Sequence, residues 1–202
     1  MSILTDRKSI RKYNPNVKIS HEEMNEILNK TSRAPSSMNM QPWRFFVIES
    51  PQAKEKLRPI LYGNQLQLDT SSAMIVIMSD LEKYELTETI FQQAYDAHLM
   101  PKEVMDRQIR NISNMANRLT KEAISKSNLI DCGLAAMQLM LVAKEHGYDT
   151  CPIGGFKHDQ IHQVLGIDPN RYEPVMIVSI GKADEDGYTS LRLDLEHTTS
   201  YL

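Results

Sequence analysis

The spacing of hydrophobic and polar residues predicts more helices than strands in this chain. Apolar residues recur at helical spacing after Ser20, and Ser20 and Glu23 have the spacing of a capping box that begins a helix. Short runs of aromatic and β-branched residues predict buried strands at residues 43–49, 73–79 and 174–180. This mixture predicts an α+β fold in which helices wrap a central sheet.

The same pattern predicts four further helical segments. One begins at Pro51, because proline is favoured at the first helical position. Residues 86–127 are helical in pattern and polar, whereas residues 129–146 are apolar on nearly every side and end at Gly147. A helix that is apolar all round is buried in a core or a subunit interface. Residues 157–165 predict a short helix.

Loops separate these elements. Residues 33–42 contain two prolines and two serines, and a second loop holds Pro152, Gly154 and Gly155. Because the chain contains no repeat or long linker, we expect residues 1–202 to form a single domain. The polar tail, about residues 183–202, is too long to be a mere chain end, so we expect it to pack on a partner.

Composition excludes several classes of function. The 202 residues carry a net charge of −3, which argues against non-specific nucleic-acid binding. No apolar run approaches the ~20 residues of a membrane span, and we expect no secretory signal. Cys132 and Cys151 are too few for a disulfide framework, and the histidines form no metal-binding motif. We therefore expect a cytoplasmic protein with no membrane, nucleic-acid or metal partner.

The first candidate chemical segment lies near the N-terminus. On an extended chain, residues two apart share a face, so Arg7, Ser9 and Arg11 point together. Two guanidinium groups around a hydroxyl suit a phosphate. Taken alone, this segment is also compatible with a solvated basic surface.

Two loops are further candidates. In residues 34–43, small side chains allow a flat ligand to approach the backbone, and Asn39 and Gln41 add amide donors and acceptors. Gly154 and Gly155 also permit close backbone approach. Taken alone, the first segment is better explained as a tight turn before a strand, and the second is also explained as a loop that needs unusual dihedral angles.

The order of these motifs is more specific than any one of them. The series R-x-S-x-R at residues 7–11, A-P-S-S-x-N-x-Q-P-W-x-F at 34–45, P-I-G-G-F at 152–156 and a late Arg192 resembles the FMN-dependent nitroreductase family. The resemblance implies a mainly antiparallel sheet and an intertwined homodimer that holds two FMN molecules between its subunits.

The resemblance also implies roles for particular residues. The residues that match the phosphate and flavin-edge segment are Arg7, Lys8, Ser9, Arg11 and Arg192. The residues that match a loop reaching the flavin of the other subunit are Pro35, Ser36, Ser37 and Asn39. The residues that match polar or backbone contacts to the ring are Asn64, Gln65, Pro152, Ile153, Gly154 and Gly155.

Within this last group, the backbone N–H groups of Gly154 and Gly155 match those that face the hydride-accepting nitrogen and the adjacent carbonyl. Some family members carry a lysine where this chain has Ser190, so either Ser190 or Lys182 is expected to complete the phosphate site.

The function implied is an NAD(P)H-dependent reductase of nitroaromatic, quinone or similar small acceptors, working by ping-pong hydride transfer. No catalytic side chain is expected, because the flavin carries the chemistry. Three alternatives remain open at this point. They are a flavin-dependent dehydrogenase or oxidase of one dedicated metabolite, a flavin-binding protein with little turnover, and a helical interaction module without a ligand.

Overall fold

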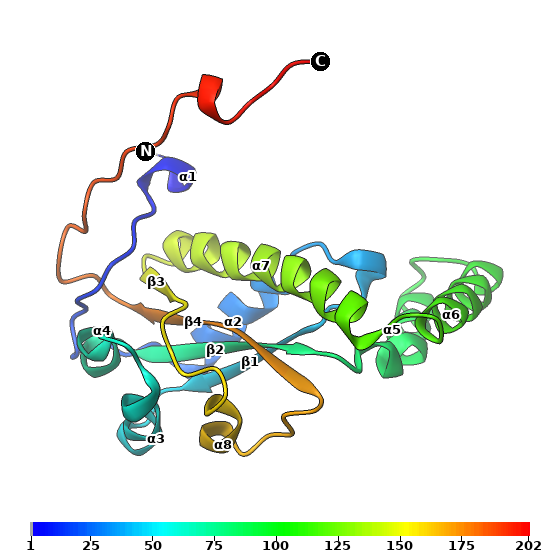
Figure 1. Ribbon diagram of the computed structural model, residues 1–202, viewed down its shortest axis with the longest axis horizontal. Helices are drawn as coiled ribbons and strands as arrows, with labels where there is room; N and C mark the ends of the chain where they lie inside the picture. Colours follow the sequence, from blue (N-terminus) through cyan, green and yellow to red (C-terminus); the bar gives the residue numbers. More distant parts are fainter. Residues whose placement is uncertain (1) are drawn as a thin grey trace.

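A four-stranded antiparallel sheet forms the centre of the computed structural model, which describes residues 2–202. The strand order is β1-β2-β4-β3 (Figure 1). The strands are β1 (Trp43–Ile48), β2 (Ala73–Asp80), β3 (Asp149–Ile153) and β4 (Tyr172–Gly181). Every residue of β2 is buried, because β2 lies inside the sheet and helices cover both of its faces.

Alternate residues of β2 face two separate apolar clusters. Ile75 and Ile77 belong to the cluster under α2 (His21–Thr31) and α7 (Lys121–Glu145). Val76 and Met78 belong to the cluster on the opposite face. The helices of that second face are α3 (Pro51–Leu57), α4 (Gln65–Thr70) and α8 (Ile161–Leu165). The result is a three-layer arrangement, with α7 and α8 on opposite sides of the sheet in Figure 1.

Two helices lie outside these layers. They are α5 (Thr87–Asp96) and α6 (Lys102–Ala116), which project at the right of Figure 1. A small cluster of their own, comprising Met40, Phe91, Met105 and Ile112, packs them on the end of the loop before β1. No helix within residues 2–202 is long and apolar enough to cross a membrane.

The segment after α1 and the start of the C-terminal tail lie side by side. After α1 (Ile3–Asp6) the N-terminal segment runs along β3, and Tyr13 pairs with Ala183 just after β4. Lys12 forms an ion pair with Asp184 at 2.6 Å. The start of the tail therefore packs on its own chain, and the exposed segment begins only after Gly187. From there the chain runs away from the body (Figure 1).

The predicted α+β fold with an antiparallel sheet wrapped by helices is confirmed. The capping box is also confirmed, because the Ser20 side chain accepts a hydrogen bond from the Glu23 N–H at the start of α2. The start of the apolar helix at residue 129 is wrong: α7 begins at Lys121, where the Thr120 side chain caps it. The first turns of α7 are polar, so the hydrophobic pattern did not distinguish them from the polar segment that precedes the helix.

The loop predicted around Pro152 is also partly wrong, because residues 149–153 form strand β3. Proline donates no ladder hydrogen bond and is tolerated at a sheet edge, which is where β3 lies. In addition, β4 begins at Tyr172 rather than residue 174, and α8 covers only Ile161–Leu165 of the helix predicted at 157–165.

Candidate functional site

The N-terminal basic segment is extended along the edge of the sheet. Ser9 makes a parallel bridge to Thr150 of β3, and the Ile10 N–H donates to the Thr150 carbonyl at 3.0 Å. Ile10 is buried, whereas Arg11 is exposed. The alternation expected of an extended chain therefore holds, and it leaves Arg7, Ser9 and Arg11 on one face.

The tail completes a pocket over this face. The pocket has a volume of about 180 Å³ and is lined by Arg7, Lys8, Ser9, Arg11, Tyr188, Ser190 and Arg192. Gly187 makes the approach possible, because it has a φ of +67° and a Cβ there would lie 2.8 Å from Ile10 Cδ1. The predicted phosphate residues from both ends of the chain thus meet in one cavity.

The charges of this pocket are held in place by tail residues. The Glu185 carboxylate accepts from the Arg11 backbone N–H at 2.6 Å, and the Arg11 guanidinium lies 5.3 Å from the Tyr188 ring centroid. Arg192 Nη1 donates to Ser190 Oγ at 2.8 Å. Lys182 instead donates to the Gly147 carbonyl, outside the pocket. Of the two residues expected to complete the site, Ser190 therefore lines the pocket.

The Gly154 and Gly155 loop follows β3 directly. The Gly155 carbonyl accepts from the Tyr62 N–H at 2.9 Å, and the Gly154 carbonyl accepts from the Phe156 N–H at 3.2 Å. Within residues 2–202, neither the Gly154 N–H nor the Gly155 N–H has a hydrogen-bond acceptor. Both glycines are exposed, so two adjacent backbone donors are available to a ligand.

Asn64 and Gln65 lie beside this loop. The Asn64 side-chain amide is 3.8 Å from the position that a Cβ on Gly155 would take. Gln65 Nε2 donates to the Arg58 carbonyl, while Gln65 Oε1 is buried without a partner in the described part of the chain. This buried acceptor needs a donor that the described residues do not supply.

A buried glutamine connects these segments. Gln67 Nε2 donates to Asn64 Oδ1 at 3.0 Å. Burial raises the pKa of the Cys151 thiol, while the charge of Arg11 and the polar side chains of Gln67 and Ser9 oppose the rise. Cys151 is thus a packed thiol. The arginine pocket and the glycine loop both adjoin β3, since Ser9 pairs with Thr150 and Gly154 follows Ile153.

The loop of Pro35, Ser36, Ser37 and Asn39 does not belong to that face. It lies behind α7, where the Ser37 N–H donates to Asp131 Oδ1 at 3.1 Å. Pro35, Ser37 and Asn39 are exposed, and Asn39 has a φ of 56°. One chain therefore brings together the phosphate pocket and the glycine loop but leaves this third predicted segment apart from both.

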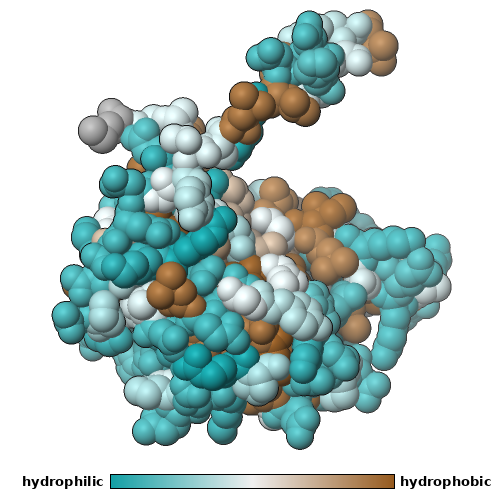
Figure 2. Space-filling model, turned by 60° about the vertical axis from the view of Figure 1, so that its left-hand side comes forward, coloured by the Kyte–Doolittle hydropathy of each residue, from teal (hydrophilic) through white to brown (hydrophobic). Residues whose placement is uncertain are grey.

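An apolar surface lies on the same helix that holds this loop. Leu129, Ile130, Leu134 and Met137 of α7 are exposed, with Ile130 at 67%. Figure 2 shows apolar surface on the body below the projecting tail, and the tail itself exposes Leu191, Leu193 and Leu195. Because one face of α7 packs on the sheet and the other is apolar and exposed, α7 has the character of an interface helix.

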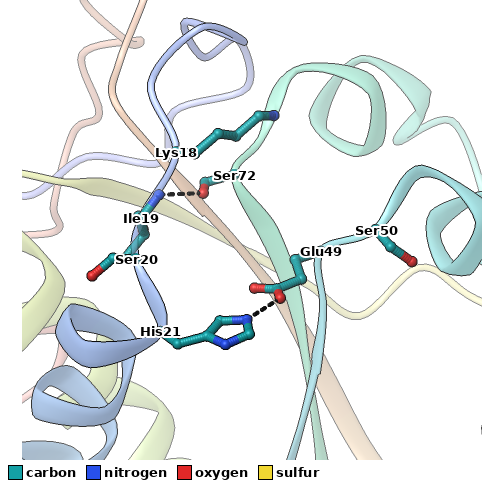
Figure 3. A pocket seen from close by; sticks show the side chains of 7 residues that line it. All are labelled: Lys18, Ile19, Ser20, His21, Glu49, Ser50 and Ser72. Atoms are coloured by element: carbon teal, nitrogen blue, oxygen red, sulfur yellow. Dashed lines mark hydrogen bonds and ion pairs between the residues drawn. The ribbon is translucent and has the colours of Figure 1, made fainter.

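A second pocket, of about 340 Å³, lies elsewhere, between the segment before α2 and the end of β1 (Figure 3). Its main charged groups pair with each other: His21 hydrogen-bonds Glu49, which raises the pKa of His21. The Ser72 hydroxyl accepts from the Ile19 N–H at 2.9 Å. This pocket shares no residue with the predicted site.

Sequence reasoning missed Tyr188 and Gln67. Tyr188 is the sole aromatic residue between Gly181 and Arg192, which was the available signal for it. Gln67 gave no signal, because its role depends on α4, a helix that the hydrophobic pattern did not reveal.

Comparisons with known proteins identify a family and several similar proteins. A model of the nitroreductase family matches residues 4–182. Bacillus subtilis YdgI, named as a candidate NAD(P)H nitroreductase, is 49% identical over 97% of this chain and 94% of its own length. The structure of a candidate nitroreductase from Exiguobacterium sibiricum in complex with FMN is 48% identical, with a TM-score of 0.97, and the match covers 99% of this chain and 95% of that one. The enone reductase of CLA biosynthesis in Lactiplantibacillus plantarum is 32% identical over 99% of this chain and 93% of its own length.

The buried pair beneath the Ser37 loop yields a prediction. Lys83 is fully buried, and its Nζ lies 3.7 Å from Asp131 Oδ2. Asp131→Ala removes both the acceptor of the Ser37 N–H and the charge that faces Lys83, so we expect the free energy of unfolding to fall by about 3–5 kcal/mol. Urea denaturation measures this change. The control is Lys83→Met combined with Asp131→Leu, which should recover most of the loss; a single variant that loses less than about 1 kcal/mol would contradict the prediction.

Proposed function

Because the chain belongs to the nitroreductase family, we propose that it is an FMN-dependent oxidoreductase that moves electrons from NAD(P)H to small acceptors. The observation that carries the proposal is the pocket in which Arg7, Ser9, Arg11 and Arg192 converge beside β3, the strand that leads into two free backbone donors at the glycine loop. Nitroaromatics and quinones are the acceptors that we propose, and a cytoplasmic location is part of the proposal.

The residues present suit FMN. A phosphate monoester carries about −1.5 to −2 charges, and arginine binds it through paired, charge-assisted hydrogen bonds. Arg7, Arg11 and Arg192 would hold the phosphate, with Ser9 and Ser190 as hydroxyl partners. Because these side chains close the phosphate end of the site, we propose FMN rather than FAD.

The glycine loop would hold the reactive edge of the ring. The two N–H groups of Gly154 and Gly155 would donate to the hydride-accepting nitrogen and its neighbouring carbonyl. Asn64 and Gln65 would add polar contacts, and the exposed Pro152 would pack beside the ring. Ile153, also expected at the ring, is buried in the core and supports the loop from below. Bound FMN supplies the hydride chemistry. Since solvent can supply protons, no side chain of this chain needs to act as a general acid or base.

We also propose that the site is complete only in a homodimer. The loop that carries Ser37 and Asn39 lies apart from the phosphate pocket of its own chain, so a second copy would have to supply it. The exposed apolar face of α7 suits such an interface. Tail residues 188–202 are exposed along their length, which supports packing of this segment on the partner.

A second class of acceptor follows from one relative. The Lactiplantibacillus plantarum protein is named for enone reduction. An α,β-unsaturated carbonyl accepts a hydride at its β-carbon and a proton at its α-carbon, and the same arrangement of ring and backbone donors would serve both acceptor classes. This second candidate represents a dedicated metabolic substrate rather than a broad range of acceptors.

The direct test is cofactor identification followed by two-step kinetics. Mass spectrometry of the cofactor released from the purified yellow protein should find FMN. Stopped-flow mixing with NADH and with NADPH should reduce the flavin without an acceptor, and a nitroaromatic, a quinone or an enone should then reoxidise it. Initial-rate plots should give parallel lines, because both substrates use the same flavin face in turn. FAD, no flavin, or reduction only in the presence of acceptor would refute the proposal.

The proposed role of Arg11 in binding the FMN phosphate can be tested with one substitution. Arg11→Ala removes a charged partner of the phosphate, and hydrogen bonds to charged groups contribute roughly 1.5–3 kcal/mol each. We therefore expect the dissociation constant of FMN, measured by fluorescence titration, to rise about ten- to a hundredfold, with little change in stability. Arg118→Ala, which removes the same charge from an exposed position after α6, is the matched control. Equal FMN affinities for both variants would mean that Arg11 is only solvated surface.

The shared site predicts complementation between defective chains. Arg11→Glu and Asn39→Trp should each abolish FMN binding in their homodimers, because both sites then carry a defect. In a mixed dimer the two defects fall in the same site and leave the other site native. Dimers refolded together and purified through two different tags should therefore regain about one FMN per dimer, with turnover. If both residues served the flavin of their own chain, verified mixed dimers would show no recovery.

A further inference from the structure

His158 contacts the glycine loop although no motif includes it. Its Nε2 lies 3.3 Å from the Gly154 carbonyl oxygen. Its ring stacks on the Phe156 ring, with centroids 4.1 Å apart and an angle of 11° between the planes. Phe156 is buried and bridges to Leu61, so the histidine stacks on a fixed surface while its own side chain stays exposed.

These contacts fix one side of the loop backbone. The Gly154 carbonyl is held by His158 and by the Phe156 N–H, and the Gly155 carbonyl is held by the Tyr62 N–H. Glycine has no Cβ to restrict its rotation, so a peptide between two glycines turns easily unless it is held. With the Gly154 carbonyl engaged, the Gly155 N–H of the same peptide unit, which lacks an acceptor within residues 2–202, keeps a defined direction.

We infer that His158 is a positioning residue, which orients and polarises the peptide between Gly154 and Gly155 toward the reactive edge of the bound flavin; the inference rests on the proposed function. The Gly154 carbonyl and the Gly155 N–H belong to the same peptide unit. A donor on that carbonyl withdraws electron density from the amide and strengthens its N–H as a donor. Nε2 donates in the matching neutral tautomer and in the protonated ring alike.

The inferred role of His158 has a consequence for the reduction potential of the bound flavin. A stronger donor at the hydride-accepting nitrogen and its neighbouring carbonyl draws electron density from the ring and favours its reduced form. Loss of the His158 donor therefore makes the flavin harder to reduce. A hydrogen bond of ordinary net strength corresponds to about a three- to tenfold change in an equilibrium constant.

Two variants separate the donor from the ring. His158→Phe keeps an aromatic ring for stacking on Phe156 but removes the donor, whereas His158→Gln keeps an N–H donor without the ring. In the FMN-loaded protein, His158→Phe should lower the equilibrium constant for two-electron reduction three- to tenfold, which equals a midpoint potential more negative by about 15–30 mV. His158→Gln should stay close to the wild-type potential. The rate of flavin reduction by the nicotinamide should follow the same order.

Each outcome has a definite meaning. A normal potential in His158→Phe would overturn the inference, and so would an equal fall in both variants, because the donor would then not be the cause. Neither result would affect the proposed function, since both require a wild-type protein that binds and reduces FMN. A wild-type protein that takes up no FMN would overturn both.

Discussion

The burial of β2 on both faces is the constraint on which the rest of the structure depends. Its residues alternate between two apolar clusters, one under α2 and α7 and one under α3, α4 and α8. A strand that is paired on both sides and covered on both faces offers no backbone or side chain to a ligand. Even its polar end is used internally, since the fully buried Asp80 binds Arg44 and Arg171. Chemistry is therefore confined to the edge of the sheet, and β3 is the edge where the candidate site lies.

The edge strand explains why distant segments meet there. An unpaired strand edge presents free backbone groups, and the N-terminal segment covers part of β3 through Ser9 and Ile10. The start of the tail then covers the N-terminal segment, with the Asp184 N–H donating to the Lys12 carbonyl at 3.0 Å. The phosphate pocket is thus made by two layers of chain added to the edge, while the glycine loop is simply where β3 stops pairing. The candidate site therefore lies where the N-terminal segment and the start of the tail are added to the edge strand β3.

The way in which the candidate site is assembled also explains which parts of it could be predicted from the sequence. In an extended segment, side chains two positions apart lie on the same face. The spacing of Arg7, Ser9 and Arg11 was therefore enough to predict that they share a face. The strands of the sheet interior were predictable for another reason, namely their short runs of apolar and β-branched residues. The start of α7 was not, because its first turns are polar and only the Thr120 cap marks them. The conformation of the loop that carries Ser37 and Asn39 could not be predicted from the pattern either, because it depends on a contact with Asp131, 94 positions away from Ser37.

That loop shows how the two halves of the proposed site depend on each other. Met38, Asn39 and Gln41 all have positive φ, at 52°, 56° and 45°, which costs a non-glycine residue on the order of 1 kcal/mol or more. The conformation persists because Asp131 and the Ser36 hydroxyl hold the backbone N–H groups of Ser37 and Gln41. Asp131 lies on α7, the helix whose exposed side is apolar. In the proposed dimer one helix therefore both forms the interface and supports the loop that reaches the partner's flavin. A ligand that touches both subunits binds the dimer and not the separated chains, so in the proposed dimer FMN binding and dimerisation would stabilise each other by mass action.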